Sequence, residues 1–528
     1  MCGFLVVGSD EYSLETFTRS LDNTAHRGPD NQDASIKEGV TWGFNRLSIM
    51  DLSSNGNQPF VYENCVVVCN GEIYNYPAIK KILSSEYNFK SGSDCEVLIP
   101  LYLKYGIETA CKFLDSEFAM VMYDAKNKKM MAARDPMGIR PMFYGYSKKD
   151  KKICFSSEAK GLIDICDGVM PFPPGHYYDD GKFVCYNDIS EIKLVSDDEM
   201  DVIGQKLKKK LETAVEKRLQ SDAPIGYLLS GGLDSSLVCA IAAKLLKKPI
   251  RTFAIGMEKD PIDLKYAQQV ADYIGSDHTE VIMTKEDVLG SLREVIYHLE
   301  SWDITTIRAS IGMYLLCKYI HKNTNLKVIM TGEVSDEIFG YKYTDFAPNP
   351  DAFQRESQKR LKELYMYDVL RADRCISANA LEGRVPFADL DFVDYSMSID
   401  PAKKMNTYNK GKYILRYAFK DSKYLPEEIL FREKAAFSDA VGHSMVDYLK
   451  EYAENKYTEE DVKNAKDKYP YGTPFTKESL LYRDIFEEFY KGKAEWIKDF
   501  WMPNKEWVGC DVTDPSARVL KNYGDSGK

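Results

Sequence analysis

Several kinds of segment are missing from this 528-residue sequence, and each absence narrows the classes of protein it could belong to. No apolar run approaches the ~18 residues that a membrane-spanning helix requires. The first residues lack the basic stretch and the following apolar stretch of a secretory signal. The 12 cysteines include no CxxC pair and none at zinc-ligand spacing from a histidine. Because unpatterned cysteines in a large chain indicate a reducing compartment, we expect a cytoplasmic protein with free thiols.

Clustered positive charge is also missing. The formal net charge is −11, which disfavours a surface for nucleic acid or for an anionic membrane. The 6 histidines show no metal-ligand spacing. With 44% hydrophobic and 29% charged residues, the composition is that of a soluble globular chain, and its length predicts at least two domains. We therefore expect small-molecule partners, and neither nucleic acid nor a membrane.

Residues 2–190 are predicted to form an α+β domain. Short apolar runs such as Val66–Val68 and Phe118–Met122 indicate strands, and Asn70-Gly71 and Pro136–Gly138 are expected to interrupt them. Strands of this kind, mixed with short helical stretches, favour antiparallel sheets.

The pattern changes after about residue 197. A long amphipathic helix is predicted over 200–218, and strand-like runs then alternate with helical ones. The strand-like runs are 225–229, 252–255 and 328–330, and the helical ones are 238–246 and 266–274. Such alternation predicts an α/β domain over 205–528, with a doubly wound parallel sheet and extra helices. We expect the linker within 186–205 and a mobile tail after Trp507.

A cysteine at the second position is the first candidate catalytic group. Removal of the initiator methionine would leave Cys2 with its thiol and a free α-amino group on one residue. A thiolate is a strong nucleophile, and an α-amino group of pKa ~7.7–8.0 is a suitable nearby base. In isolation, an incidental N-terminal cysteine would explain the same residue.

Further motifs follow Cys2-Gly3 along the chain. They are Arg27-Gly28-Pro29-Asp30, Asn45–Ile49, Asn70–Asn75 and Ser91–Glu96. Together with Cys2-Gly3 they resemble the class II, N-terminal-nucleophile glutamine amidotransferases. The resemblance implies an αββα sandwich of antiparallel sheets and hydrolysis of glutamine at Cys2.

Asn70 and Gly71 are the oxyanion hole that this resemblance implies. Asn70 offers a side-chain N–H donor, and Gly71 offers a backbone N–H that no Cβ obstructs. The alternative is a hairpin turn, because Asn-Gly is the strongest short hairpin signal.

The two ends of glutamine need partners of opposite charge. Arg46 is expected to bind the α-carboxylate bidentately, and Asp94, supported by Glu72, the α-ammonium. The remaining residues of the predicted glutamine site are Leu47, Ser48, Ile49 and Met50.

A second constellation follows the strand-like run 225–229. The segment Ser230–Ser236 places two glycines and three hydroxyls at a strand-to-helix turn, which makes a cradle of backbone N–H groups for an anion. It differs from the Walker A pattern. It resembles the PP-loop of ATP pyrophosphatases, which cleave ATP between the α- and β-phosphates. The predicted ATP-binding residues are Leu229, Ser230, Gly231, Gly232, Asp234, Ser235, Ile255, Thr331 and Gly332.

Acidic residues follow the strand-like run 328–330, at Thr331–Glu337. Strand ends are the usual place for ligands of α/β proteins. Release of pyrophosphate needs Mg²⁺, which prefers carboxylate and phosphate oxygens. By resemblance, Asp234 and Asp336 are the expected Mg²⁺ ligands, and Glu333 would assist adenylate formation or accept a proton. Capping of a helix N-terminus by acids is the alternative.

Other segments resemble the asparagine synthetase family, and the resemblance extends over about residues 2–445. These segments are Trp302–Ser310, Leu370–Arg374, Ala380–Phe387, Lys412–Arg416 and Arg432–Asp439. They make Arg308 a candidate clamp for an oxyanion or a carboxylate, although a helical arginine could also pair with an acid. Lys434 is expected to stabilise the leaving phosphates.

The resemblance also implies a reaction. Glutamine would be hydrolysed in the first domain, while ATP and aspartate would form β-aspartyl-AMP in the second. Ammonia would reach the adenylate by an internal route, giving asparagine, AMP and pyrophosphate. The alternatives are a related amidotransferase or β-lactam-synthetase-like enzyme acting on another carboxylate, and a non-catalytic glutamine or ATP sensor. The oligomeric state is left open, with a homodimer among the alternatives.

Val334 departs from the family pattern, which usually has glycine there. A β-branched residue restricts the backbone where glycine would be free. Val334 and Ile338 would share one face of a helix that begins near Ser335. We therefore predict a negative φ at Val334 and a side chain buried beside Ile338.

Overall fold

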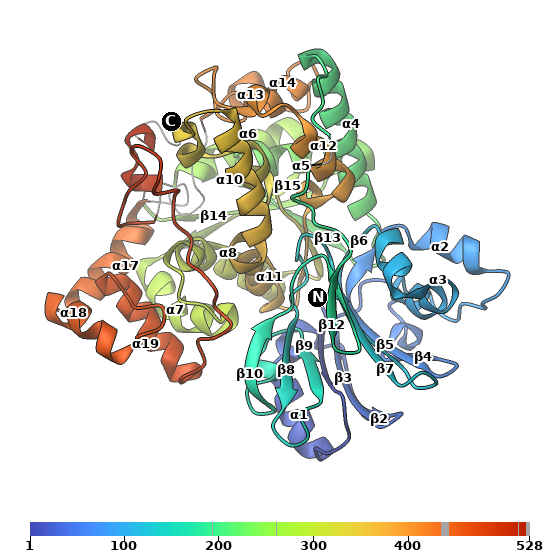
Figure 1. Cartoon of the computed structure of the whole chain (residues 1–528). Helices are drawn as coiled ribbons and strands as arrows, with labels where there is room; N and C mark the ends of the chain where they lie inside the picture. The colour runs from blue at the N-terminus through green and yellow to red at the C-terminus, as the bar shows by residue number, and fades with distance from the viewer. Residues whose placement is uncertain (193, 260, 434–442, 516, 524–528) are drawn as a thin grey trace.

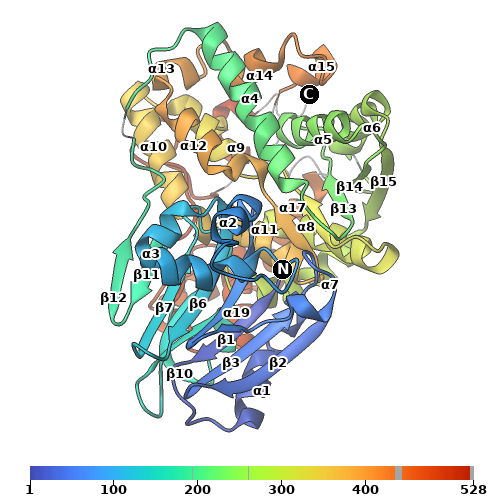
Figure 2. The same cartoon turned by 90° about the vertical axis from the view of Figure 1, so that its right-hand side faces the viewer.

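The computed structural model describes residues 1–192, 194–259, 261–433, 443–515 and 517–523. Two antiparallel sheets form the N-terminal part, and a parallel sheet with many helices forms the rest (Figure 1). The N-terminus lies at the boundary between these parts, both in this view and after a quarter turn (Figure 2). The first residues of the chain are therefore close to both domains.

Each antiparallel sheet has six strands within the described residues. The first has the order β10 (Cys166–Pro171), β8 (Phe143–Ser147), β9 (Ile153–Ser156), β1 (Gly3–Val7), β3 (Val40–Arg46), β2 (Asn31–Lys37). The second has the order β12 (Lys182–Cys185), β11 (His176–Asp179), β7 (Lys129–Arg134), β6 (Ser116–Asp124), β5 (Cys65–Ile73), β4 (Phe60–Tyr62).

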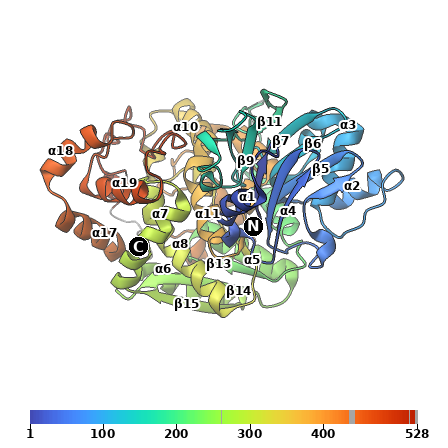
Figure 3. The same ribbon diagram turned by 90° about the horizontal axis from the view of Figure 1, so that it is seen from below.

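Side chains along each strand point alternately to the two faces of its sheet, and this alternation produces the layers of the domain. Phe4 and Val6 of β1 pack with Val66 and Val68 of β5 in the core between the sheets. The intervening residues point outward, so that Leu5 and Val7 pack on α1 (Leu14–Asp22). The outer face of the second sheet packs in the same way on α2 (Tyr76–Leu83) and α3 (Leu98–Phe113). Figure 3 shows the strands between α1 and these two helices, which confirms the predicted αββα sandwich.

Asn70 and Gly71 do not interrupt a strand, so that expectation was wrong. Both lie inside β5, where Asn70 is opposite Ala119 of β6 and Gly71 is opposite Phe118. A Cβ at Gly71 would lie 2.5 Å from the carbonyl oxygen of Glu117. The glycine therefore serves the close approach of two strands, and the hairpin alternative is excluded.

The third sheet is parallel, as predicted. Its order is β15 (Asp277–Met283), β14 (Arg251–Met257), β13 (Ile225–Leu228), β16 (Val328–Met330), β17 (Glu382–Arg384). One face packs on α7 (Lys285–Leu299), α8 (Ile304–Asn323) and α11 (Asp368–Ser377), and the other on α4 (Met200–Arg218), α5 (Leu233–Leu246) and α6 (Ile262–Ile274). The strand order reverses between β13 and β16, which is where doubly wound sheets bind ligands.

The remaining helices surround this sheet. They are α9 (Ser335–Phe339), α10 (Pro350–Glu363), α12 (Leu390–Ser398), α13 (Pro401–Lys404), α14 (Tyr413–Phe419), α15 (Glu427–Leu430), α17 (His443–Lys456), α18 (Glu459–Lys468) and α19 (Lys477–Phe489). The last three lie at the end of the molecule away from the antiparallel sheets (Figure 3). None of the described helices has the length and apolar character to cross a membrane.

The segment after Trp507 is packed against the parallel domain, so the expectation of a mobile tail was wrong for its described residues. Trp507, Cys510 and Leu520 are buried together with Tyr343 and Phe353. The polar composition concealed these anchors, because a few apolar residues suffice to hold a segment when a complementary surface faces them.

Replacing one of these anchors tests the docking of the tail. Trp507→Ala should lower the free energy of unfolding by about 3 kcal/mol, because it empties a buried aromatic site. Its neighbour Val508 is 94% exposed and serves as a matched control. Val508→Ala should leave stability within about 0.5 kcal/mol of the parent. Urea unfolding monitored by circular dichroism measures both variants, and equal stabilities would argue against a docked tail.

Candidate active sites

Cys2 lies directly before β1, beside Asn70 of β5. The backbone N–H of Cys2 donates to Asn70 Oδ1 at 3.0 Å. The backbone N–H of Leu47 lies 3.4 Å from Cys2 Sγ, and Sγ lies 3.6 Å from the Leu47 carbonyl oxygen. Asn70 Nδ2 is buried and has no hydrogen-bond partner among the described residues. A buried donor beside a nucleophile suits an oxyanion, as predicted for Asn70.

The local electrostatics favour a neutral thiol and a neutral amine. Burial raises the pKa of the Cys2 thiol to about 11, although the nearby α-ammonium of Met1 acts in the opposite direction. Burial likewise lowers the pKa of the Met1 α-ammonium to about 6. Met1 is 1% exposed, and its amine donates to the Leu381 carbonyl at 3.4 Å. Cys2 therefore needs a base, and an amine buried at this place is in the form that accepts a proton at pH 7.

Arg46 is tied to the loop 50–57. Its Nη1 donates to Ser53 O and Asn57 Oδ1, both at 2.7 Å. Its Nη2 donates to the carbonyls of Met50, at 3.3 Å, and Asp51. Arg46 thus shapes this loop, a role that the sequence did not suggest. Its expected contact with a glutamine carboxylate stays a prediction.

The two acidic residues of the predicted glutamine site are buried. Asp94 Oδ2 accepts from the Ile73 backbone N–H at 2.7 Å. Glu72 Oε2 lies 3.1 Å from Arg384 Nη2, which belongs to the parallel domain. Burial raises the pKa of both carboxyl groups. Glu72 therefore also takes part in a contact between the domains.

Leu47 and Ile49 lie between Cys2 and the parallel domain. They form a small apolar cluster with Ala223, Val328 and Ala380, and Cys2 and Met50 pack against it. Ser48 is partly exposed, and its backbone N–H donates to Asp30 Oδ2 at 2.7 Å.

The second site is a cavity of about 240 Å³ at the switch point between β13 and β16. Residues predicted for ATP and for the aspartate site share its wall: Leu229, Ser230, Gly232, Asp234, Ser235, Ile255, Arg308, Thr331, Gly332, Glu333 and Asp336. Gly231 supports the loop behind this wall, because it has a φ of +69° and a Cβ there would lie 2.5 Å from the Ala267 backbone nitrogen. Apart from Lys434, which lies outside the described residues, the predicted ATP-half residues therefore belong to one place.

The two loops of this cavity touch closely. A Cβ at Gly332 would lie 2.7 Å from the Ser235 backbone nitrogen. The hydroxyl groups of Ser230 and Ser235 are 3.0 Å apart. Glycine at 332 thus keeps the acidic loop against the start of α5, where backbone N–H groups favour a phosphate.

Lys412 belongs to the family-like segment Lys412–Arg416, but the sequence predicted no role for it. Its Nζ lies 2.9 Å from Asp234 Oδ2, 2.6 Å from Asp336 Oδ1 and 2.9 Å from Ser335 Oγ. The two predicted Mg²⁺ ligands therefore converge on one centre of positive charge. Two carboxylates beside a phosphate-binding loop are a donor set that fits Mg²⁺.

Two arginines of the cavity wall are paired with acids. Arg371 Nη2 contacts Glu333 Oε2 and lies 3.4 Å from Asp368 Oδ1. Arg308 Nη2 lies 2.5 Å from Glu478 Oε2, and Arg308 Nη1 lies 3.0 Å from Asp514 Oδ1. Arg308 is thus paired with acids, which was the alternative to a substrate clamp. A role of Arg308 toward a substrate stays a prediction.

The prediction for Val334 was wrong in one of its two parts. Its φ is +79°, in the left-handed region, whereas we predicted a negative value. Its side chain is 2% exposed and belongs to the same core cluster as Ile338, as predicted. The chain must turn sharply between Gly332, which touches Ser235, and the start of α9, and this turn sets the backbone at Val334. The strain of roughly 1–2 kcal/mol is offset by burial of the valine, which contributes about 1.5–3 kcal/mol.

These two sites define a class of protein: a glutamine amidotransferase joined to a nucleotide-binding α/β domain. Residues 1–172 match the family described as glutamine amidotransferase domain, and residues 206–349 and 344–510 match the family described as asparagine synthase. The glutamine-hydrolysing asparagine synthetases of Cricetulus griseus and Homo sapiens are each 41% identical to this chain, with 100% of both chains covered. The chain belongs to the glutamine-hydrolysing asparagine synthetase family, as the sequence motifs suggested.

Two substitutions at Val334 separate backbone strain from side-chain packing. Val334→Ala and Val334→Gly both lose the buried side chain, but only glycine is free of the left-handed penalty. Val334→Gly should therefore be more stable than Val334→Ala by about 1 kcal/mol. Chemical denaturation of the two variants side by side measures the difference. The opposite order, which is normal for residues with negative φ, would contradict the observed backbone.

Proposed function

We propose that this protein makes asparagine from aspartate, with glutamine as the nitrogen donor and ATP as the activating co-substrate. The observation that carries the proposal is the pairing of two sites in one chain of this family. One site has Cys2 beside the unsatisfied amide of Asn70, and the other has Asp234, Glu333 and Asp336 around one cavity. We propose that residues 2–190 carry the first activity and residues 205–528 the second.

In the first half-reaction, Cys2 attacks the carboxamide carbon of glutamine. After removal of Met1, the new α-amine of Cys2 takes the thiol proton. The oxyanion is stabilised by Asn70 Nδ2 and by the backbone N–H of Gly71. Ammonia leaves, and water then releases glutamate from the thioester.

Binding of glutamine is assigned to residues around Cys2. Arg46 receives the α-carboxylate, which requires its guanidinium to exchange some of its contacts with the loop 50–57. Asp94 receives the α-ammonium, and Glu72 supports it while paired with Arg384.

In the second half-reaction, the aspartate β-carboxylate attacks the α-phosphorus of ATP, and pyrophosphate leaves. Ser230, Gly232 and Ser235 bind phosphate oxygens at the start of α5. Asp234 and Asp336 would hold Mg²⁺, which neutralises phosphate charge when bound. Lys412 lies between these two acids, and its ammonium compensates their charges and holds them in place. Lys434 is assigned to the leaving phosphates.

Ammonia must cross from one site to the other without meeting bulk water, where it would be protonated. The apolar cluster of Leu47, Ile49, Val328 and Ala380 lies next to Cys2. Val328 begins β16, and Thr331 and Gly332 follow its other end in the wall of the second cavity. We propose that ammonia passes along this side of β16.

Two further proposals concern the setting of the enzyme. The 12 cysteines are unbridged in the structure, which supports a cytoplasmic location. The homodimer stays a proposal that solution measurements of mass would test.

Removal of the thiol should separate the two half-reactions. Cys2→Ala should abolish glutamine-dependent synthesis and spare ammonia-dependent synthesis, because the adenylate forms in the other domain. Cys185 lies in the same domain but is exposed on β12, so Cys185→Ala is the matched control. Asparagine formed from each nitrogen donor is measured. Loss of both activities in folded Cys2→Ala would exclude two independent sites.

Neutralising the acids should weaken the metal-dependent half. Asp234→Asn and Asp336→Asn should each slow Mg²⁺-dependent release of pyrophosphate and leave glutaminase activity measurable, because an amide is a poorer Mg²⁺ ligand than a carboxylate. The control is Asp391→Asn, whose carboxylate is largely exposed and pairs with Lys210. Pyrophosphate release is measured at limiting Mg²⁺. Unchanged release in both variants would remove these residues from the metal site.

A further inference from the structure

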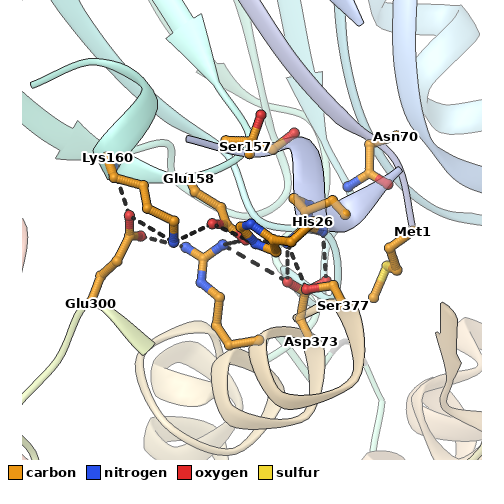
Figure 4. Close-up of polar contacts among 12 residues, drawn as sticks. Met1, His26, Asn70, Ser157, Glu158, Lys160, Glu300, Asp373 and Ser377 are labelled. Carbon is orange, nitrogen blue, oxygen red and sulfur yellow. Dashed lines mark hydrogen bonds and ion pairs between the residues drawn. The ribbon is translucent and has the colours of Figure 1, made fainter. Parts of the chain in front are cut away.

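A cluster of buried charges joins the two domains directly behind Cys2. We call it the interdomain cluster. Its members in the first domain are Arg27, Glu158 and Lys160, and its members in the second domain are Glu300, Asp373, Arg374 and Ser377. Each of these charged residues is at most 3% exposed. Figure 4 shows Asp373 and Ser377 reaching from one helix toward the region of His26 and Glu158.

Arg27 connects this cluster to the nucleophile. Its Nε donates to the carbonyl oxygen of Cys2 at 2.8 Å. The far end of the same guanidinium is held by Asp373, with Nη1 to Oδ2 at 2.8 Å and Nη2 to Oδ1 at 3.1 Å. Its Nη1 also contacts Glu158 Oε1 at 2.7 Å and Ser377 Oγ at 3.0 Å. Arg27 is thus clamped at one end by the second domain and grips the Cys2 backbone with the other.

This grip matters most after maturation. The Cys2 backbone is held by Asn70 on its nitrogen and by Arg27 on its carbonyl oxygen. When Met1 is removed, Cys2 loses the preceding peptide bond, and these two backbone contacts, together with the contacts of its thiol with Leu47, hold the residue in place. A displacement of about 1 Å at a reacting group is enough to cost up to 10²-fold in rate.

We propose that Asp373, a residue of the ATP-binding domain, is a positioning residue for glutamine hydrolysis. It holds Arg27 against the Cys2 carbonyl, so the glutaminase site is complete only when the second domain is docked. The inference rests on the proposed function, because it assigns a role within the glutaminase half of that reaction.

Other members of the cluster account for the docking itself. Glu300 accepts from the backbone N–H groups of Ala159, at 3.0 Å, and Lys160, at 2.7 Å. Arg374 lies 2.8 Å from both Glu158 and Glu300. Asp373, in contrast, lies 3.9 Å from Arg374 and directs both of its oxygens at Arg27. Asp373 therefore acts on Cys2 through Arg27, and the other members hold the domains together.

The test compares Asp373→Asn with Glu300→Gln in the full-length enzyme. Both variants neutralise one buried carboxylate of the same cluster with little change of shape, but only the first touches Arg27. We expect Asp373→Asn to lower the glutaminase kcat at least about tenfold. The KM for glutamine should stay within about twofold, because other residues bind the ends of glutamine. Ammonia-dependent asparagine synthesis should also stay within about twofold, and Glu300→Gln should keep most of the glutaminase kcat.

A third variant shows whether the effect passes through Arg27. Arg27→Lys removes the forked guanidinium that donates to both oxygens of Asp373 and should itself lower the glutaminase kcat. The double variant should then lose no more than Arg27→Lys alone, because the two residues act in series. Independent, multiplying losses would overturn the proposal.

Outcomes that overturn the inference differ from those that overturn the function. Equal glutaminase losses in Asp373→Asn and Glu300→Gln, or an unchanged kcat in Asp373→Asn, would reduce Asp373 to a structural role. Absence of glutaminase activity in the parent enzyme would instead overturn the proposed function.

If Asp373→Asn loses ammonia-dependent synthesis too, Ser377→Ala decides, because it removes a single neutral contact to Arg27. It should lower the glutaminase kcat severalfold with ammonia-dependent synthesis intact, and no change would overturn the proposal.

Discussion

The pairing of buried charges across the domain boundary is the constraint on which the rest of this structure depends. Arg27 and Arg374 are fully enclosed, and each meets carboxylates from both domains. Arg384 of the parallel domain likewise meets Glu72 of the antiparallel one. A buried charge left without its partner costs several kcal/mol, so a displaced docking is disfavoured even where apolar contacts would allow it. The relative placement of the two sites follows from this requirement.

Two elements of the parallel domain, β16 and α11, each connect the surroundings of Cys2 with the second cavity. β16 begins beside the apolar cluster next to Cys2 and leads at its other end into the wall of the ATP-half cavity. α11 presents Asp373 to Arg27, and two residues earlier Arg371 pairs with Glu333 in that cavity. One element therefore offers apolar contacts between the sites, and the other offers charged ones. The chemistry of each site is local, but the elements that hold the sites are shared.

In the second cavity, which is the predicted ATP site, a cation compensates the acidic charge of a loop, and side-chain burial offsets the backbone strain of the same loop. Asp234 and Asp336 are held together by the ammonium of Lys412, which compensates two carboxylates that would otherwise repel. The loop between them turns so sharply that Val334 adopts a left-handed backbone. Strain of this kind persists where the surrounding structure determines the conformation, and here the buried valine side chain supplies part of that support.

The sequence by itself determined the sheet types and the loop Ser230–Ser236, because these depend on local periodicity and on residue types whose chemistry is specific. It linked Cys2 with Asn70 only through the resemblance of the ordered motifs to the glutamine amidotransferases. It did not determine that Asn70-Gly71 would continue a strand, since that follows from pairing with β6, which comes more than 40 residues later. It also could not place Lys412 between its two acids, or Asp373 against Arg27, which are separated by 346 positions. Such partners are chosen by the packing of the whole chain. A buried charge takes whichever opposite charge the folded chain brings within reach, and local sequence carries no record of that distance.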